Sequence, residues 1–558
     1  MAHTLQVATD YCFDVAASIY SSPHPLLSIP PDLNILSFIF SITSAPTFNH
    51  RIAIADSSTA QSLTFLQLRR HIQYVARAFS FLGIRQQDVI LMVLPNSTHF
   101  PVIFFAIISL GAIATCANPV STPTEIIKQA TDSNAKLLIT LPTLAARLQS
   151  HVHMPMLVVD ETTSSKALPA SASKSESLQL SQILKQSSRH LTPSIRIQQT
   201  NPAVLLYTSG TTGASKGALI SHKNLISAAL QVRLAAGECY EGAGGQCFLC
   251  CVPMFHCFGM SVIMVAQLHM GNTIITMPKY SIDDMLDAIE AYQVTHLPVV
   301  PPIMVALAKH ESATRSRLSS LIEVVCGAGR VSDKAMDEVL QRLQSNAYVR
   351  LDYGMTEASG RIAITACKRL TEAKVGFVGS LTSGMEALVV DPSSKKRLPP
   401  NEQGELWVRG SNVIQGYFRN EEATAATISQ DGWLYTGDLV YFDNDGGLHI
   451  VGRLKDLIKC KGFQVAPTEL ETILLTHPAI TDAAVVGFPD EYAGEIPVAF
   501  IVQAQGSLLK ESDVISFVEA KVAPYKRIRQ VRFVKTLPKT ASGKVMRHKL
   551  MHQATSKL

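Results

Sequence analysis

Short apolar runs alternate with stretches of helical periodicity between about residues 52 and 390. The runs at 89–94, 135–140 and 321–326 are rich in aliphatic side chains. Such runs are typical of strands buried on both faces of a parallel sheet, and their alternation with helices indicates α/β layers. Because 558 residues exceed what one hydrophobic core supports, we expect a large α/β N-terminal region with several subdomains.

The pattern changes at two places along the chain. Residues 160–199 are rich in Ser, Lys and Thr, which predicts an exposed connection with one helix near 178–186. A compact α+β pattern begins near 453–456 and continues to the last residue. We therefore expect two units, an N-terminal domain at 1–453 and a small C-terminal domain at 454–558.

Composition excludes several classes of protein. A net charge of +5 spread along the chain does not indicate a nucleic-acid partner, although it suits anionic ligands. The uncharged stretches 101–120 and 242–278 contain Pro, Gly, Asn or His, so buried core elements explain them better than transmembrane spans. Residues 1–13 lack the basic flank and apolar run of a secretion signal.

The ten cysteines have no paired spacing, so we expect reduced thiols rather than a disulfide framework. A cluster of cysteines and one histidine could suggest zinc, but it lies in an apolar run without a second spaced pair. Buried thiols are the better interpretation for this cluster, which consists of Cys247, Cys250, Cys251, His256 and Cys257.

The stretch 207–217 has the sequence Tyr-Thr-Ser-Gly-Thr-Thr-Gly-Ala-Ser-Lys-Gly. We expect it to connect a strand at 203–207 to a helix at 220–230. Its glycines permit close approach of the backbone to a phosphate, and its hydroxyls, N–H groups and lysine can bind one. The ordered spacing argues against a solvated turn, and a Walker A loop would need Ser or Thr directly after the lysine. The candidate phosphate-binding residues are Thr208, Ser209, Gly210, Thr211, Thr212, Gly213 and Lys216.

This loop resembles the phosphate signature of the adenylate-forming enzymes, which include acyl-CoA synthetases, firefly luciferase and nonribosomal peptide adenylation domains. Further motifs of that family follow in its order, and residues 94–97 and 117–119 resemble the 4-coumarate CoA ligase branch with its peroxisomal acyl-CoA ligases. The ordered motifs are Tyr-Gly-Met-Thr-Glu-Ala at 353–358, Thr-Gly-Asp at 436–438, Gly-Arg-Leu-Lys-Asp at 452–456, Lys-Cys-Lys-Gly-Phe-Gln at 459–464 and Ser-Gly-Lys at 542–544.

The resemblance implies that ATP converts a carboxylic acid to an acyl-AMP. In this first step, it assigns Lys544 to the carboxylate and α-phosphate, Thr356 to phosphate, and Glu357 to Mg²⁺, a hard cation that prefers oxygen ligands. The resemblance also implies that Asp438 and Arg453 contact the ribose. The other nucleotide contacts that it implies are Ala328 and Tyr353.

For the second step, the resemblance implies that the C-terminal domain rotates about Lys455 so that a thiol attacks the acyl-AMP. Lys459 and Gln464 match residues brought to the adenylate, and His256 matches a residue flanking it. The matched coenzyme A contacts are Lys461, Gly462 and, further upstream, Lys279. Closure of a domain also excludes water that would hydrolyse the anhydride.

The expected acyl pocket departs from the plant 4-coumarate ligases. Arg330 and Arg361 stand where those enzymes are apolar, and Asp352 replaces a glycine. This disfavours hydroxycinnamate as the acid. The arginines could accommodate a polar or second acidic group of the substrate, or they could form ion pairs with Asp352 or at the surface.

The sequence ends in Ser556-Lys557-Leu558, which matches a peroxisomal address read by an import receptor. We therefore expect a peroxisomal, ATP-, Mg²⁺- and CoA-dependent ligase of a small or medium hydrophobic carboxylic acid. A luciferase-like oxygenase is the nearest rival. A carrier-loading enzyme is disfavoured because no carrier segment follows Lys544, and a non-catalytic sensor because the family's lysines are present.

Overall fold

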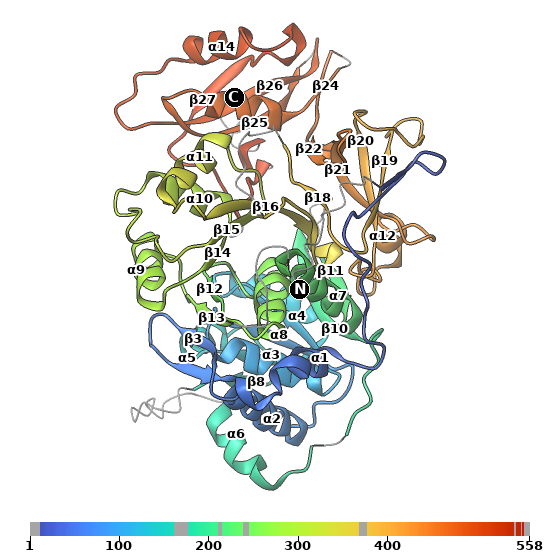
Figure 1. Ribbon diagram of the computed structural model, residues 1–558, viewed down its shortest axis with the longest axis vertical. Helices are drawn as coiled ribbons and strands as arrows, with labels where there is room; N and C mark the ends of the chain where they lie inside the picture. Colours follow the sequence, from blue (N-terminus) through green and yellow to red (C-terminus); the bar gives the residue numbers. More distant parts are fainter. Residues whose placement is uncertain are drawn as a thin grey trace, which may run out of the picture.

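The computed structural model describes residues 12–160, 177–192, 194–209, 215–237, 245–367, 376–461, 463–490, 492–540, 543–547 and 549–551. Among these residues the strands form four sheets. Figure 1 shows the C-terminal sheet, coloured orange to red, at one end of the elongated molecule and the first helices at the other. This arrangement confirms the expected α/β fold with a smaller C-terminal part.

The first sheet is parallel except for the antiparallel pair β10 and β11. Its strands, in spatial order, are β11 (Ser215–Ser221), β10 (Pro202–Ser209), β6 (Ile113–Cys116), β5 (Val89–Val93), β7 (Ala135–Thr140), β8 (Met156–Val158) and β9 (Ser177–Gln179). The strands predicted at 89–94 and 135–140 are thus confirmed. The helix expected at 220–230 is corrected, because residues 215–221 pair with β10 as a strand and the helix begins only at His222.

The second sheet is larger and carries the strand expected at 321–326 as β15. Its strands, in spatial order, are β18 (Ser380–Leu381), β17 (Gly360–Ile364), β16 (Tyr348–Met355), β15 (Glu323–Gly327), β14 (His296–Val299), β12 (Cys247–Cys250), β13 (Thr273–Thr276), β3 (Ile52–Asp56) and β4 (Ser62–Thr64). Strands β5 and β15 are buried along their whole length, which explains their uninterrupted apolar runs.

Helices cover these two sheets (Figure 1). The described helices between residues 35 and 425 are α1 (Ile35–Thr43), α2 (Phe65–Phe81), α3 (His99–Ser109), α4 (Pro123–Asp132), α5 (Pro142–Leu148), α6 (Leu180–Gln186), α7 (His222–Gly237), α8 (Ala266–His269), α9 (Ile282–Tyr292), α10 (Pro301–Lys309), α11 (Asp333–Arg342) and α12 (Glu421–Ala425). Single turns of 3₁₀ helix lie at η1 (Pro46–Phe48), η2 (Ser187–Arg189), η4 (Thr356–Ala358), η5 (Leu454–Asp456) and η6 (Pro524–Lys526), and η3 (Phe258–Val265) is a π-helix. In the described part of the chain, no helix combines the length and hydropathy that a membrane span requires.

The described strands form two further sheets. One contains β1 (Cys12–Asp14), β2 (Ile19–Ser21), β19 (Glu386–Val390), β20 (Gly404–Arg409), β21 (Leu434–Phe442) and β22 (Leu448–Arg453). The other contains β24 (Phe463–Val465), β23 (Ile458–Cys460), β26 (Gly494–Gln503), β25 (Ile480–Asp490) and β27 (Gln530–Phe533), with α13 (Pro467–Leu475) and α14 (Glu511–Glu519).

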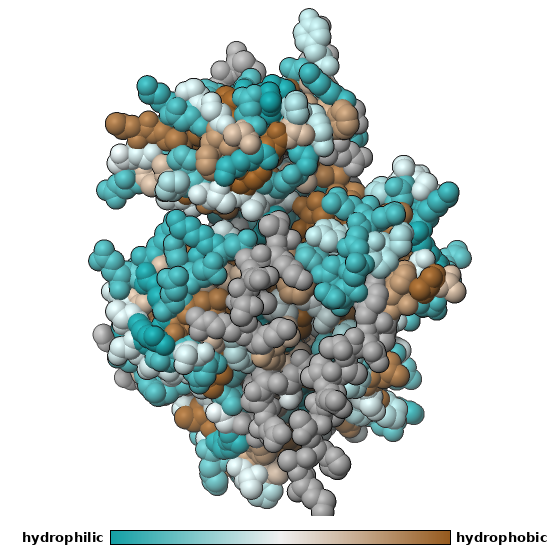
Figure 2. Space-filling view, turned by 45° about the horizontal axis from the view of Figure 1, so that its top comes forward, coloured by the Kyte–Doolittle hydropathy of each residue, from teal (hydrophilic) through white to brown (hydrophobic). Residues whose placement is uncertain are grey.

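This last sheet has a hydrophobic core of its own, built from residues between Ile458 and Val531. Figure 2 shows the C-terminal part as an upper lobe with both hydrophilic and hydrophobic areas on its surface, set off from the rest by an indentation in the outline. Contacts between described residues that join it to the larger part include a hydrogen bond from the Arg330 guanidinium to the Thr468 carbonyl (3.4 Å), one from the Thr468 hydroxyl to the Val451 carbonyl, and the packing of Gly543 against Pro302.

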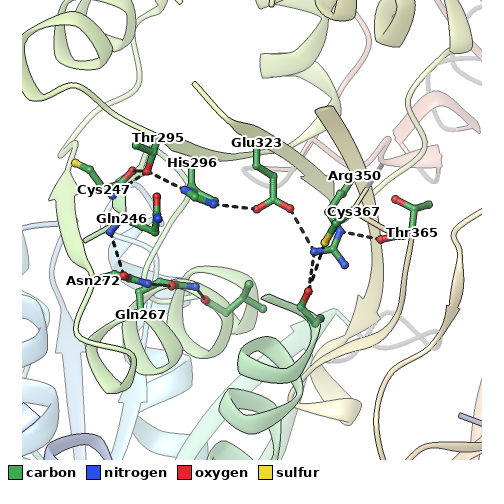
Figure 3. A network of polar contacts seen from close by, with 12 residues as sticks. Gln246, Cys247, Gln267, Asn272, Thr295, His296, Glu323, Arg350, Thr365 and Cys367 are labelled. Atoms are coloured by element: carbon green, nitrogen blue, oxygen red, sulfur yellow. Dashed lines mark hydrogen bonds and ion pairs between the residues drawn. The ribbon is translucent and has the colours of Figure 1, made fainter. Parts of the chain in front are cut away.

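A buried polar network connects adjacent strands of the large sheet (Figure 3). The Glu323 carboxylate of β15 lies 3.3 Å from a guanidinium nitrogen of Arg350 on β16 and 3.5 Å from the His296 imidazole on β14. Arg350 also donates to the Thr365 carbonyl at 2.7 Å. Because buried charges are tolerated only when paired and hydrogen-bonded, this network is consistent with a structural role in holding the sheet.

Candidate active site

The phosphate-loop residues that the structure describes lie on a β-hairpin. Thr208 is near the end of β10 and Lys216 near the start of β11, where they face each other in register. The Lys216 ammonium lies 5.4 Å from the ring centroid of Tyr417, within range of a cation–π interaction. Residues 210–214, with the predicted Gly210, Thr211, Thr212 and Gly213, lie outside the described residues, as does the side chain of Ser209.

Glu357 joins this hairpin to the Thr-Glu motif. One oxygen of its buried carboxylate, Oε1, accepts hydrogen bonds from Thr208 Oγ1 (3.3 Å) and from the Tyr417 hydroxyl (2.9 Å). Burial and the neighbouring carboxylate raise the pKa of Tyr417, so its hydroxyl remains a donor at neutral pH. Sequence reasoning missed Tyr417, because an isolated tyrosine carries no motif and only the fold brings it to Glu357.

Asp438, Tyr353 and Arg453 form a second cluster. The Tyr353 hydroxyl donates to Asp438 Oδ2 (2.6 Å), and Arg453 Nε pairs with Oδ1 (2.9 Å). Burial and the Asp438 charge hold the pKa of Tyr353 well above its usual value, and the Asp438 charge raises that of Arg453. Strands β21 and β22 place Asp438 opposite Arg453 in register. The structure therefore brings together three residues that the sequence motifs assigned to the nucleotide.

Lys544 lies beside this second cluster, in a tight turn of the C-terminal part. Its carbonyl accepts from the Thr540 N–H (2.8 Å), and its own N–H donates to Thr540 Oγ1 (3.1 Å). Although the residue keeps solvent-exposed surface, surrounding protein desolvates its ammonium and the positive charge of Arg453 acts in the same direction. These effects outweigh the attraction of Asp438 and lower the pKa of Lys544 to about 8.

Lys459 and Gln464, which are expected to serve the second step, lie on the C-terminal sheet and not in the Asp438 cluster. Lys459 lies on β23, paired in register with Gln464 of β24, and is exposed. Its backbone N–H donates to a Glu495 oxygen (2.7 Å). Among the described residues no hydrogen bond or ion pair joins Lys459 to Asp438. Gly462 and the side chain of Gln464 lie outside the described residues, and the other predicted lysines, all exposed, are Lys279, Lys455 and Lys461.

His256 lines a cavity of about 320 Å³ together with Thr356, Phe255, Cys116 and Tyr207. Its Nδ1 lies 3.7 Å from the thiol of Cys257, which in turn lies 3.5 Å from the Thr356 hydroxyl. The π-helix η3 begins directly after these residues and is buried throughout. π-Helical turns occur often at functional sites, and this one begins two residues after the predicted adenylate-flanking histidine.

The two arginines of the predicted acyl pocket have protein partners. Nε and Nη2 of Arg361 donate to Asp352 Oδ2 at 2.9 and 2.7 Å, and both side chains are buried. Arg330 is exposed and contacts the Thr468 carbonyl. Of the alternatives left open by the sequence, the ion pair with Asp352 therefore accounts for Arg361. Ala328, assigned to the adenine side, follows β15 with a left-handed φ of 64°.

One expectation about the cysteines is corrected, because Cys367 is disulfide-bonded. A disulfide requires that the fold bring two cysteines to a suitable distance and orientation, which spacing along the chain does not reveal. In the described part of the chain no group of three or more His, Cys, Asp or Glu side chains could hold a metal ion. Among the described residues the free cysteines include Cys116, Cys247, Cys250, Cys251, Cys257, Cys326 and Cys460.

Comparison with known families gives two matches along the chain. The model of the AMP-binding enzyme matches residues 43–418, and that of the AMP-binding enzyme C-terminal domain matches residues 469–544. The chain belongs to the AMP-binding enzyme family. The adenylate-forming resemblance inferred from the motifs is thereby confirmed.

Members of this family with similar sequences match over almost their full length. A probable CoA ligase of Humulus lupulus, CCL5, is 42% identical over 97% of this chain and 97% of its own. Peroxisomal OPC-8:0-CoA ligase 1 of Arabidopsis thaliana is 41% identical, again over 97% of both chains. ATP-bound MatB of Rhodopseudomonas palustris superposes with a TM-score of 0.81 at 25% identity, covering 94% of this chain and 100% of its own.

Proposed function

We propose that this AMP-binding enzyme is an ATP-dependent acyl-CoA ligase acting on a small or medium hydrophobic carboxylic acid. The observation that carries the proposal is the convergence of Lys544, from the C-terminal part, on the Asp438–Tyr353–Arg453 cluster of the larger part. The CoA-ligase names of relatives matched over 97% of the chain support the same activity.

In the first half-reaction a carboxylate oxygen of the acid attacks the α-phosphorus of ATP, and pyrophosphate leaves. Negative charge grows around the α-phosphate, so a cation already in position stabilises the transition state. Lys544 is that cation in the proposal. Thr208, Lys216 and Thr356 hold the phosphates, and Asp438 with Arg453 holds the ribose.

The residues present fit a magnesium ion. Mg²⁺ is usually held by one or two carboxylates together with substrate phosphates. Glu357 offers one such carboxylate, fixed by Thr208 at the base of the phosphate loop and by Tyr417. When bound, Mg²⁺ would neutralise phosphate charge. The part played by the chain is to hold the Glu357 oxygens in place.

In the second half-reaction the thiol sulfur of CoA attacks the acyl carbon, and AMP leaves. We assign Lys459 and Gln464 to this step and Lys461, Gly462 and Lys279 to CoA. This requires the unit at 454–558 to rotate relative to 1–453 about Lys455, withdrawing Lys544. The exposure of Lys459 and the separate core of the C-terminal part support such a rotation.

We also propose a peroxisomal location through an import receptor that binds Ser556-Lys557-Leu558, which lie outside the described residues. The peroxisomal name of the Arabidopsis relative supports it. Removing the three residues should leave activity in extracts unchanged and move a fluorescently tagged protein to the cytosol, as measured by microscopy. Continued import of the truncated protein would contradict the assignment.

A screen of aromatic, fatty and dicarboxylic acids for CoA-dependent AMP release tests the activity itself. We expect release with at least one hydrophobic acid, and a matching acyl-CoA by mass spectrometry. Consumption of oxygen in place of CoA would favour a luciferase-like oxygenase, and AMP release without CoA transfer would favour a carrier-loading enzyme.

A further inference from the structure

We propose that Arg547 is a positioning residue that fixes the Lys544 turn for adenylate formation. Its guanidinium makes a bidentate contact with Glu471 of α13, with Nη1–Oε1 and Nη2–Oε2 distances of 2.6 and 3.1 Å. Its Nε lies 3.3 Å from Asp456 Oδ2 in η5, and Nη1 donates to the Val485 carbonyl of β25 (3.3 Å). One side chain thus joins three separate elements.

Arg547 stands three residues after Lys544 in a segment that has little regular structure. Besides the Thr540 contacts, the Met546 N–H donates to the Pro538 carbonyl (2.8 Å). Gly543 has a φ of 80°, and a Cβ there would lie 2.6 Å from Pro302 of α10. The turn therefore lies at the seam between the two parts of the molecule, where a small displacement would move the Lys544 ammonium relative to Asp438.

The partners of Arg547 make it suited to hold the Lys544 turn in place. Asp456 belongs to η5, the turn that connects β22, with Arg453, to the C-terminal sheet. Glu471 is itself fixed, because its Oε1 accepts the Val485 N–H at 2.8 Å. The three charged side chains keep only 18%, 14% and 25% of their surface for Arg547, Glu471 and Asp456. A planar guanidinium can satisfy these acceptors together, which an ammonium cannot.

This inference rests on the proposed function, because Arg547 acts through Lys544. Only the first half-reaction needs Lys544 beside the nucleotide. Loss of the anchor should therefore affect adenylate formation far more than transfer of a pre-formed acyl-AMP to CoA. A merely structural residue would impair both steps together.

The test compares Arg547→Ala and Arg547→Lys with the matched control Lys526→Ala. Lys526 makes a similar two-oxygen contact with Glu469 on the same helix, at 2.8 Å to each oxygen, but it comes from η6 and not from the Lys544 turn. We expect Arg547→Ala to lower pyrophosphate exchange by roughly 10- to 100-fold, the scale of a misplaced catalytic group, and thioester formation from acyl-AMP by less than about threefold. Arg547→Lys should recover little of the exchange, and Lys526→Ala should change neither step.

Hydrogen exchange gives a readout that does not depend on activity. Amides of residues 543–547 should exchange faster in Arg547→Ala than in Lys526→Ala, while those of β25 and β26 stay protected in both. Two results would overturn the positioning role of Arg547. One is an equal loss of both half-reactions in Arg547→Ala, and the other is an unchanged rate of amide hydrogen exchange in residues 543–547. Absence of any pyrophosphate exchange in the wild-type enzyme would instead contradict the proposed function, and the amide measurement would still decide whether Arg547 anchors the turn.

Discussion

The two groups of candidate residues on either side of η5 differ in how far the fold has already arranged them. Upstream, Asp438 is buried and holds both Tyr353 and Arg453 within hydrogen-bonding distance. Downstream, Lys459 is exposed on β23. Groups that serve both half-reactions gain from rigid placement, whereas groups that serve one must arrive and leave. Lys544 lies between these extremes, because it interacts electrostatically with Arg453 and Asp438 of the buried cluster but belongs to a turn of the C-terminal part.

The largest expected effect comes from Lys544→Ala. It should reduce acid-dependent pyrophosphate exchange by on the order of 10²- to 10³-fold, because an electrostatic contact to the developing charge is lost. Thioester formation from pre-formed acyl-AMP should remain nearly normal. Equal losses in the two assays would remove the distinction between the two groups of residues.

Lys459→Ala should show the opposite pattern. We expect transfer from acyl-AMP to CoA to fall by about 10- to 100-fold, while pyrophosphate exchange changes little, because Lys459 is exposed and no hydrogen bond or ion pair between described residues joins it to Asp438. Both rates can be measured on one preparation. A larger effect on exchange than on transfer would place Lys459 in the first step.

Variants of Arg361 test whether the ion pair in the expected acyl pocket is fixed by the fold, as the Asp438–Tyr353–Arg453 cluster is. Removal of one partner from a buried ion pair leaves the other charge unpaired, so Arg361→Val should lower the free energy of unfolding by about 3–5 kcal/mol. The double variant with Asp352→Val should recover much of this loss. Denaturant unfolding measures both values. Activity should fall similarly for all acids. A selective 10- to 100-fold loss for acids with a distal polar group would show that the substrate shares Arg361.

The smallest effect is a pH dependence. Because the pKa of Lys544 is lowered to about 8, its charged fraction falls as the pH rises through that value. If the charged form stabilises the α-phosphate, kcat/KM for pyrophosphate exchange should drop about tenfold between pH 7 and pH 9. Lys544→Arg should lack this alkaline limb, since a guanidinium stays charged. An identical limb in both enzymes would assign the titration to another group.

Local sequence patterns predicted the strands and motif residues that depend only on neighbouring positions in the chain. The buried strands β5 and β7 follow from apolar runs that need no knowledge of distant partners. The motifs that contain Glu357, Asp438 and Lys544 were recognisable because their spacing is local. The helix expected at 220–230 begins two residues later than predicted. Residues 220 and 221 fit a helical pattern, but they pair with β10 as the end of β11.

By itself, the sequence determined the α/β class, the motif residues and the resemblance to adenylate-forming enzymes. Tertiary structure alone decided which residues share contacts across the chain. Tyr417 reaches Glu357, Arg361 pairs with Asp352, Cys367 enters a disulfide, and Arg547 connects η5 to α13. The physical reason is that hydrogen bonds and ion pairs require approach within about 3 Å, a distance that chain folding sets and spacing along the sequence does not.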